Sequence, residues 1–454
     1  MSQEKTIKSF YKNYSYKSRK PYFIDDSLLT DDQKHKLTES ETFCMLPWVH
    51  MHAFPDGRAY PCCLSEYWHP VGDLRKNTME EVWNQTPYKN MRVNMLNDQP
   101  CKECTKCYEN ERNGAFSMRN DANRNYGHLI NEVEQTHEDG TNPEFKIRYW
   151  DVRFSNLCNM KCRSCGPIFS SQWYNDHVKL YNNVPKAPSY LSVEENRYVE
   201  RNMERIEYTT GNEDDMIAQM LPHVPYLEQV YFAGGEPLIM KEHYFMLEKL
   251  IEHNKHDVRI QYNTNFSELR YKDKHVFDYW KNFTNVSVGA SLDGMGPQAE
   301  LIRKGTEWAQ TEENRRRMIA EVPHVDFYIS ATVSSMNVLH VLKFHREWTE
   351  KGLIKAKDFN VNICQSPDWY RIDIFPEWFK QQIIYPAYEE HIAWLEPQDD
   401  LQRATTGFKS LLNMMKANDA SQHWPRFVEE TAKLDNIRNE NFWKLFPEFS
   451  QLIK

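Results

Sequence analysis

Short strand-like runs alternate with helical stretches between residues 147 and 372, and this alternation limits the possible folds more than any other feature of the sequence. The strand-like runs lie at 145–155, 227–235, 258–265, 285–294, 325–333 and 358–364. Helical patterns occupy stretches between them, such as 241–253, 297–322 and 337–352. Strands that alternate with helices form a parallel sheet with right-handed crossovers. We therefore predict an α/β fold with a partial (β/α)6 TIM-like barrel.

The rest of the chain is expected to form further units around this barrel, because 454 residues exceed what one core usually organises. A hydrophobic fraction of 40% is sufficient for a folded protein. The predicted units are a polar N-terminal leader, a cysteine-rich domain, a charged helical connector, the barrel core and a helical C-terminal extension, at 1–42, 43–110, 111–146, 147–372 and 373–454.

Charge and hydropathy argue against two classes of partner. The N-terminus is polar and basic, and no apolar run reaches the roughly 18 residues that cross a membrane. We therefore expect a soluble, cytoplasmic protein with no membrane partner. A net charge of -9 argues against a broad nucleic-acid-binding face, and the basic run 315–317 is expected to be a solvated helix face.

Nine of the ten cysteines fall into two clusters. Cytoplasmic reductants keep such residues as thiols, so the clustering indicates metal binding. Cys364 stands alone and is expected to be a small buried hydrophobic residue. The first cluster consists of Cys44, Cys62, Cys63, Cys101, Cys104 and Cys107, and the second of Cys158, Cys162 and Cys165.

The second cluster, in "SNLCNMKCRSCG", follows the first predicted barrel strand. Ligand sites in such folds lie outside the carboxyl ends of the strands. Thiolates at this spacing bind zinc or an iron-sulfur cluster. A structural zinc site needs four ligands, and this loop offers Cys158, Cys162 and Cys165 with no fourth ligand nearby. The spacing alone leaves both alternatives open.

At the end of the second strand stands "YFAGGEPLIM", with Gly234, Gly235, Glu236 and Pro237. Two glycines let the backbone approach a ligand, and a carboxylate or carbonyl can accept hydrogen bonds from an ammonium group. A C-x3-C-x2-C loop followed by this turn on the next strand resembles the radical S-adenosylmethionine (radical SAM) superfamily, over about 147–372.

This resemblance implies that Cys158, Cys162 and Cys165 hold three irons of a [4Fe-4S] cluster. S-adenosylmethionine would chelate the open fourth iron, and an electron from the cluster would cleave it to a 5′-deoxyadenosyl radical that abstracts hydrogen from a substrate. Because the cofactor supplies the reactivity, few acid-base residues are expected. No catalytic residue beyond the cluster ligands is predicted.

The resemblance implies further cofactor contacts: Asn265 in "YNTN", Ser291 and Asp293 in "SLDG", and Arg303 in "LIRKG". Arg303 could pair with the carboxylate of the cofactor. The alternative is a turn with an exposed arginine. Many members carry an aromatic residue just before the third cysteine, where this chain has Ser164, so adenine packing must come from elsewhere.

The first cluster follows the pattern C-x12-G-x4-C, with Cys44, Gly57 and Cys62, and "CKECTKC" comes later. This resembles the auxiliary-cluster module called twitch, a shortened SPASM domain. The resemblance implies a second [4Fe-4S] cluster on Cys44, Cys62, Cys104 and Cys107, with Cys63 and Cys101 as spares, while His50 and His52 are expected to be structural.

Two points remain open for this module. Four thiolates in such groups also make a good zinc site. The module precedes the barrel here, whereas it normally follows it, so function requires that it pack near the same barrel mouth. A cluster with four cysteine ligands could not bind substrate without losing a ligand, which favours a role in electron transfer.

The sequence therefore predicts a radical SAM oxidoreductase or maturase-like enzyme that acts on a peptide or protein side chain. A low-potential electron donor such as flavodoxin or ferredoxin is expected. One alternative is the same chemistry on a small molecule or nucleotide, and another is a zinc-stabilised binding module without catalysis. The polar insertion 170–215 is expected to be either a lid over the barrel mouth or a surface loop.

Overall fold

The computed structural model describes residues 28–66, 69–112, 117–182 and 208–452. Within them, nine strands form one sheet in the order β13-β12-β10-β7-β6-β4-β1-β2-β3. Neighbouring strands from β13 to β1 are parallel, and β2 and β3 continue the sheet in antiparallel pairing. The predicted leader falls largely on residues 1–27 and the predicted lid or loop largely on 183–207, which lie outside the described residues.

Each of the six predicted runs contains one strand of this sheet, and the six pair in sequence order. Along the longest, Phe327, Ile329, Ala331 and Val333 are buried on one face, because successive side chains point to opposite faces. The α/β class with a mostly parallel sheet is thus confirmed, while its curvature as a partial barrel stays a prediction. The strands are β4 (Tyr149–Val152), β6 (Gln229–Phe232), β7 (Arg259–Thr264), β10 (Asn285–Ala290), β12 (Asp326–Val333) and β13 (Phe359–Ile363).

The cysteine-rich segment is joined to this sheet. Its strand β1 (His50–Ala53) pairs in parallel with β4, with His50 opposite Tyr149 and Ala53 opposite Val152. The apolar side chains of the segment and of the core form one continuous cluster. Its other elements are β2 (Arg58–Tyr60), β3 (Gly72–Asp73), α3 (Leu46–Val49), α4 (Met79–Trp83), α5 (Thr86–Leu96), η3 (Lys102–Cys104) and α6 (Thr105–Arg112).

Two of the three predicted helices match single helices, α12 (Lys241–Glu252) and α16 (His340–Glu350). The prediction of one helix over 297–322 was wrong. The stretch divides into α14 (Gly296–Ile302), β11 (Arg303–Lys304) and α15 (Trp308–Glu321). The break comes where Gly305 has a φ of +108°, a left-handed conformation that suits glycine.

The basic run on α15 is only partly a solvated face. Arg316 pairs with Glu312 on the surface, but Arg315 donates from Nε to the Leu353 carbonyl at 2.8 Å and lies over the Phe327 ring. The alkyl stem and planar head of arginine can cover apolar surface in this way. The prediction of a purely solvated face was therefore wrong for Arg315.

Short elements fill the connections. The N-terminal side has α2 (Asp31–Lys34) and the π-helix η2 (His35–Glu39), and the connector has α7 (Met118–Tyr126), η4 (Gly127–Leu129) and α8 (Ile130–Val133). The core adds β5 (Lys161–Cys162), α9 (Trp173–Tyr181), α11 (Glu213–Met220), η6 (Leu221–Tyr226), η7 (Pro237–Ile239), β8 (Arg270–Tyr271), β9 (Lys274–His275) and α13 (Val276–Trp280).

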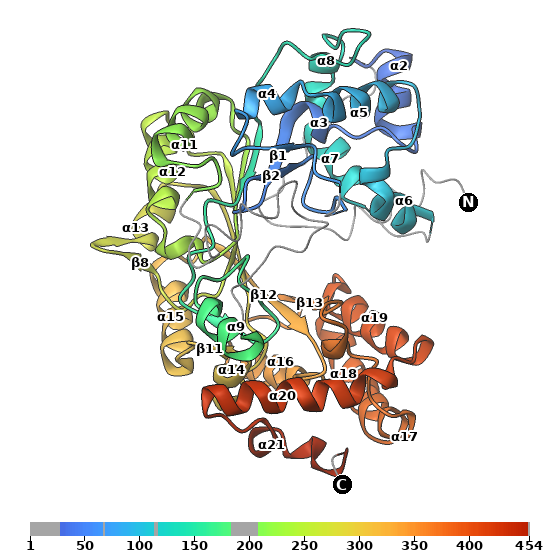
Figure 1. Cartoon of the computed structure of the whole chain (residues 1–454), viewed down its shortest axis with the longest axis vertical. Helices are drawn as coiled ribbons and strands as arrows, with labels where there is room; N and C mark the ends of the chain where they lie inside the picture. The colour runs from blue at the N-terminus through green and yellow to red at the C-terminus, as the bar shows by residue number, and fades with distance from the viewer. Residues whose placement is uncertain (1–27, 67–68, 113–116, 183–207, 453–454) are drawn as a thin grey trace.

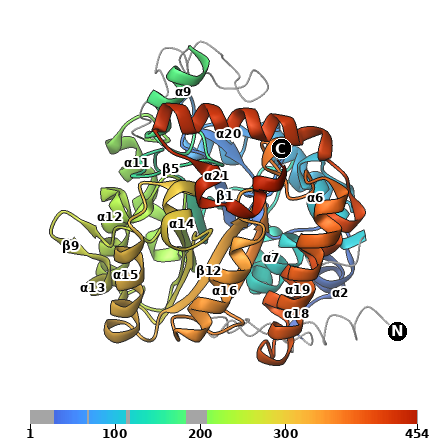
Figure 2. The same ribbon diagram turned by 90° about the horizontal axis from the view of Figure 1, so that it is seen from below.

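The C-terminal stretch is helical and lies beside the last strands of the sheet. Figure 2 shows α20 crossing the molecule close to α9 and α21, and α19 contacts β13. Its elements are η8 (Asp368–Tyr370), α17 (Glu377–Phe379), η9 (Lys380–Ile384), α18 (Tyr385–Leu395), η10 (Glu396–Gln398), α19 (Arg403–Ala417), η11 (Ser421–His423), α20 (Trp424–Arg438), α21 (Phe442–Leu445) and η12 (Pro447–Leu452).

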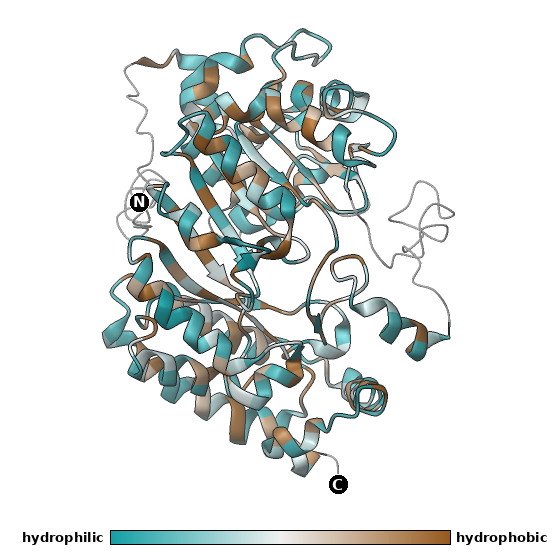
Figure 3. Ribbon diagram, turned by 90° about the vertical axis from the view of Figure 1, so that its left-hand side faces the viewer, coloured by the Kyte–Doolittle hydropathy of each residue, from teal (hydrophilic) through white to brown (hydrophobic). Residues whose placement is uncertain are grey.

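Hydrophilic and hydrophobic residues alternate along most of these helices (Figure 3). That pattern is typical of helices that bury one side and expose the other. Among the described helices, none is both long enough and apolar enough to pass through a lipid bilayer.

Candidate functional site: two cysteine-lined pockets

A cavity of about 930 Å³ lies at the carboxyl ends of the parallel strands. The thiols of Cys158, Cys162 and Cys165 all line it. Phe54 and Arg58 of the cysteine-rich segment line the same cavity, so this segment does pack at the mouth of the core. The structure therefore brings the predicted triplet together in a space that the two parts of the chain share.

The loop that carries the triplet is held by short backbone contacts. Within it, β5 pairs with β11 in antiparallel register, and Cys162 lies opposite Arg303. The Cys162 carbonyl accepts hydrogen bonds from Trp173 Nε1 at 2.8 Å and from the Cys165 amide at 3.0 Å. These contacts fix the spacing of the last two cysteines.

Burial dominates the electrostatics of the three thiols. Desolvation raises the pKa of Cys158, Cys162 and Cys165, to about 12 for Cys165, because it penalises the thiolate. Arg303 opposes this shift at Cys162, since its Nη1 lies 3.6 Å from Sγ and favours the thiolate. Iron would add the positive charge that buried thiolates need.

The glycine turn packs against the cysteine loop. Gly235 has a φ of +55°, and a Cβ there would lie 2.3 Å from the Leu157 carbonyl oxygen. The Glu236 amide donates to the same carbonyl at 2.8 Å. Gly234 and Gly235 line the cavity, whereas Glu236 and Pro237 do not. The close approach that requires glycine at 235 is therefore an approach to the cysteine loop.

Glu236 is fully buried and faces β7. Its carboxylate accepts hydrogen bonds from Thr264 Oγ1 at 2.6 Å, the Asn265 amide at 2.6 Å and the Leu238 amide at 3.1 Å. Burial raises its pKa to about 7, although the three donors oppose the shift. This carboxylate holds the turn against β7. Because the Glu236 side chain does not line the cavity, its contact with the cofactor stays a prediction.

Asn265, Ser291 and Arg303 line the cavity, as a role in cofactor binding requires. Asp293 does not line it but lies behind Arg303, where Oδ2 accepts from Arg303 Nε at 2.7 Å and Oδ1 from the Thr332 amide at 2.8 Å. Arg303 is therefore oriented by Asp293 rather than exposed in a turn. The predicted roles of these four residues remain predictions.

Sequence reasoning missed Arg153, which also lines the cavity. Its Nε donates to Asp151 Oδ1 at 2.7 Å, and His52 Nδ1 lies 3.0 Å from the other oxygen of the same carboxylate. An aspartate and an arginine two residues apart at the end of an apolar run could have signalled this pair. Cys364 is buried, as predicted, and it too lines the cavity.

The first cluster forms a second, smaller pocket. Cys44, Cys62, Cys104 and Cys107 all line it, whereas Cys63 and Cys101 do not. Cys101 Sγ donates to the Met91 carbonyl at 3.7 Å and also contacts the Cys104 thiol, and Cys63 lies near Asp151 and Arg153. The pocket thus contains the four thiols assigned to the auxiliary cluster and excludes both spares.

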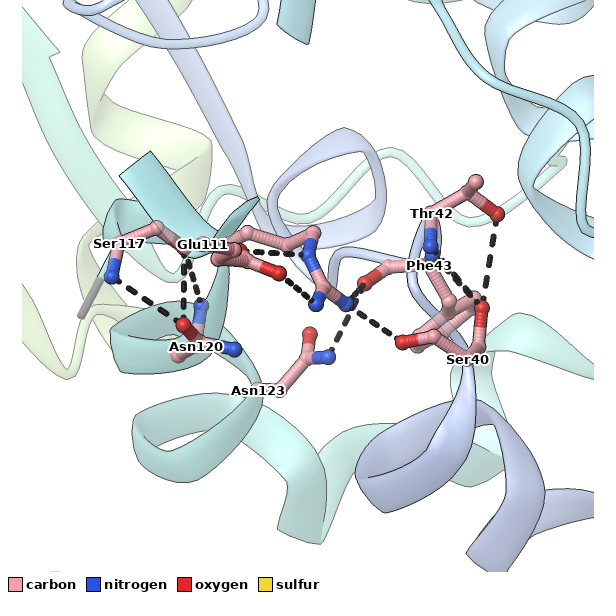
Figure 4. Close-up of polar contacts among 8 residues, drawn as sticks. Ser40, Thr42, Phe43, Glu111, Ser117, Asn120 and Asn123 are labelled. Carbon is pink, nitrogen blue, oxygen red and sulfur yellow. Dashed lines mark hydrogen bonds and ion pairs between the residues drawn. The ribbon is translucent and has the colours of Figure 1, made fainter. Parts of the chain in front are cut away.

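Arg119 also lines this pocket, and three residues that it binds, Ser40, Phe43 and Glu111, are labelled in Figure 4. It donates from Nη1 to the carbonyls of Ser40 at 2.8 Å and Phe43 at 2.9 Å, and it forms an ion pair with Glu111. The charge of Arg119 lowers the pKa of Cys44 and Cys107, against the larger effect of burial. A buried cation beside the thiols stabilises their charged form.

Both cysteine sets fit an iron-sulfur cluster by their chemistry, since each is a group of buried and half-buried thiols around one pocket with an arginine beside it. In the described part of the chain, no three histidine, cysteine, aspartate or glutamate side chains converge on one metal ion. A four-iron cluster carries its thiolates on separate irons.

The chain is an α/β protein with two cysteine-lined pockets, one in the N-terminal segment and one at the carboxyl ends of the parallel strands. Residues 44–108 match the family model for SPASM, an iron-sulfur cluster-binding domain. This match confirms the predicted SPASM-like module and its iron-sulfur cofactor class. No curated protein matches the sequence significantly.

Several solved structures are weakly similar in fold. Native anSMEcpe with bound AdoMet shares 20% identity over 55% of this chain and 59% of that one, with a TM-score of 0.34. Native anSMEcpe with bound AdoMet and Cp18Cys peptide shares 17% over 54% and 57%, with a TM-score of 0.32. TYW1 with a lysine-pyruvate adduct shares 11% over 56% and 72%, with a TM-score of 0.27. The chain thus spans less than two thirds of either anSMEcpe structure.

Proposed function

We propose that the protein is a radical SAM enzyme in which Cys158, Cys162 and Cys165 hold the catalytic [4Fe-4S] cluster. The observation that carries this proposal is the convergence of these three thiols and the glycine turn on one cavity of about 930 Å³ at the carboxyl ends of parallel strands. When bound, the cluster and S-adenosylmethionine supply a 5′-deoxyadenosyl radical that takes a hydrogen atom from the substrate.

The residues of the chain orient and enclose these groups. Arg303, held by Asp293, presents its guanidinium to the cavity, where it can pair with a carboxylate of the cofactor. The carbonyls and amides of the turn at Gly234 and Gly235 lie at the same wall. The position before the third cysteine is Ser164 and offers no aromatic ring. Phe54 and Phe169 supply apolar surface in the same cavity, with their rings in edge contact at 5.5 Å between centroids.

The auxiliary site is proposed to hold a second [4Fe-4S] cluster on Cys44, Cys62, Cys104 and Cys107, which line one pocket. With four thiolates, no iron is left open for substrate, so its proposed role is to move electrons to or from the substrate radical. A reducing donor such as flavodoxin or ferredoxin would supply electrons to the enzyme. Normal turnover by a protein without this cluster would contradict that role.

The proposed substrate is a peptide or protein side chain, by resemblance of the SPASM-like module to those of peptide-modifying radical enzymes. Residues of the cysteine-rich segment and of the core both line the cavity, which has a volume of about 930 Å³. Turnover of a small molecule or nucleotide, with none on peptides, would replace this substrate class. A colourless protein that contains zinc and no iron would replace the enzyme by a binding module.

The test is reductive cleavage of S-adenosylmethionine by the anaerobically reconstituted, dithionite-reduced protein. We expect 5′-deoxyadenosine from the native chain and none from a C158A/C162A/C165A variant. The control is Cys364→Ala, which removes a fourth cavity thiol outside the triplet and should keep the cleavage activity. No product from the iron-loaded native protein, or equal product from the triple variant, would refute the proposal.

A further inference from the structure

The C-terminal helix α20 is linked to the cysteine loop by buried ion pairs. Arg163, between the second and third cysteines, has a side chain with no exposed surface. Its Nη2 pairs with Asp435 on α20 and, at 2.7 Å, with Glu440 just beyond that helix. These partners are 272 and 277 residues away along the chain. The contact is therefore made by the fold and not by local sequence.

A second set of pairs reaches the other side of Cys162. Arg438 at the end of α20 pairs with Asp176 on α9 at 2.7 Å, and both side chains are almost fully buried. The other oxygen of Asp176 pairs with Lys161 at 2.9 Å. Both residues that flank Cys162 in sequence, Lys161 and Arg163, are thus tied to the C-terminal helix.

Two further contacts close this network around the loop. Lys304 on β11 pairs with Glu440 at 3.0 Å, and β11 is the strand that pairs with β5. Arg438 lies over the Trp173 ring, and the Nε1 of Trp173 donates to the Cys162 carbonyl. Figures 1 and 2 both show α20 close to α9.

Such a network is a costly way to gain stability alone. Buried ion pairs lose much of their attraction to desolvation, but breaking one leaves an unpaired buried charge. Charge and hydrogen bonding near a cluster also set its reduction potential. A network that surrounds one cluster ligand is well placed for that second effect.

We propose that Asp435, Arg438 and Glu440 are positioning residues that fix the loop around Cys162 and set the charge around the catalytic cluster. The C-terminal extension is then a working part of the cluster site. This inference rests on the proposed function, because it requires a cluster at the triplet. It concerns residues that touch neither substrate nor cofactor and act through the loop.

The test is an anaerobic redox titration of the full-length reconstituted protein, followed by the electron paramagnetic resonance signal that changes when S-adenosylmethionine is added. Glu440→Gln removes one negative charge from the network. We expect the ratio of reduced to oxidised cluster at a fixed potential to rise by about threefold or more, because a less negative environment favours the reduced cluster. Glu440→Asp keeps the charge and should restore most of the native ratio.

The matched control is Glu429→Gln. Glu429 lies on α20, and its carboxylate pairs with Lys433 on the exposed surface, so the titration of this variant should match that of the native protein. An unchanged ratio in Glu440→Gln, or an equal change in Glu429→Gln, would overturn the inference.

Loss of the cluster is also informative. If Glu440→Gln loses iron while Glu440→Asp keeps it, the charge of Glu440 holds the loop and the inference stands. Equal loss in both variants would reduce the role of Glu440 to packing and overturn it. A native protein that binds no cluster at the triplet would instead refute the proposed function, so the two failures are distinguishable.

Discussion

Glu236 connects three parts of the site through one buried carboxylate. It belongs to the turn that packs on the cysteine loop, and it binds Thr264 and the Asn265 amide at the end of β7. A group with several donors around it in a buried position is expensive to alter, because each lost partner leaves a desolvated polar group.

We predict that Glu236→Gln lowers the free energy of unfolding by roughly 1–3 kcal/mol, because the new amide NH2 would face the donors that now bind a carboxylate oxygen. Urea unfolding at pH 8, where the native carboxylate is charged, measures the change. The matched control is Glu268→Gln at an exposed position two residues before β8. Equal free energies of unfolding in the two variants would show that the buried Glu236 carboxylate does not stabilise the fold.

The histidine pair His345 and His391 gives a pH dependence. Their Nδ1 and Nε2 atoms are 3.0 Å apart, and burial lowers the pKa of His345 to about 4 and of His391 to about 2. Below the ordinary pKa of about 6.5, the unfolded chain takes up protons that the folded chain refuses, so stability falls as the pH falls from about 6.5 towards 4.

Other buried histidines add to this slope, so a variant is needed to assign it. We expect His391→Gln to flatten the dependence of the urea midpoint on pH between about 6.5 and 5, because one group that resists protonation is removed. His137→Gln, at an exposed position, should keep the native slope. An unchanged slope in His391→Gln would contradict the assignment.

The choice of auxiliary ligands is also a residue-scale prediction. Cys107→Ala should lower the iron bound by the auxiliary site, because this thiol lines the pocket with the other three ligands. Cys101→Ala should keep the native iron content, since Cys101 lies outside the pocket and bonds to the Met91 carbonyl. Full iron content in Cys107→Ala would move the ligand set to Cys101 and Cys104.

Individual residues show what sequence can and cannot predict. The spacing of the triplet and the resemblance of the first cluster to the twitch and SPASM modules predicted the two cysteine sets, and each set lines one pocket. The inward direction of Glu236 and the place of Arg153 could not, since both depend on contacts between strands far apart in the chain. The pairing of Arg163 with Asp435 is hidden in the same way.

At the scale of the elements, the strands were predictable and one helix was not. Apolar runs between turn signals identified the six core strands. The strand β11 interrupts a helical pattern because it pairs with β5. This pairing could not be predicted, since β5 lies far away in sequence. Nothing local to His50–Ala53 indicates that β1 continues the core sheet beside β4.

Gly305 tests the importance of the β5 and β11 pair. A Cβ at this position would lie 2.7 Å from the Asn159 carbonyl oxygen, and its φ is +108°. We predict that Gly305→Ala lowers the free energy of unfolding by about 1–3 kcal/mol and weakens iron binding at the triplet, because the cysteine loop must shift.

The control for this variant is Gly352→Ala. Gly352 also has a positive φ, of +68°, but no neighbouring atom lies within 4 Å of the added Cβ. Gly352→Ala should lower the free energy of unfolding without loss of iron, because this variant has the same kind of backbone strain but no contact with the cysteine loop. Native stability and iron content in Gly305→Ala would show that the loop tolerates the added methyl group.

At the scale of the whole molecule, one sheet joins the two cysteine sites. The cysteine-rich segment supplies β1, which pairs with β4, and the triplet loop leaves the carboxyl end of β4. Phe54 and Arg58 then bring this segment to the cavity wall. A module that precedes the core in sequence can therefore reach the same cavity, and the C-terminal extension reaches the cysteine loop from the other side through α20.

The measurement that tests this account most directly is the iron and labile sulfide content after anaerobic reconstitution. We predict roughly eight irons in the native chain and roughly four in the C158A/C162A/C165A variant, because each set of thiolates holds one four-iron cluster. The remaining iron should disappear when Cys44, Cys62, Cys104 and Cys107 are also replaced by alanine. Zinc in place of iron, or no loss of iron in the triple variant, would contradict the account.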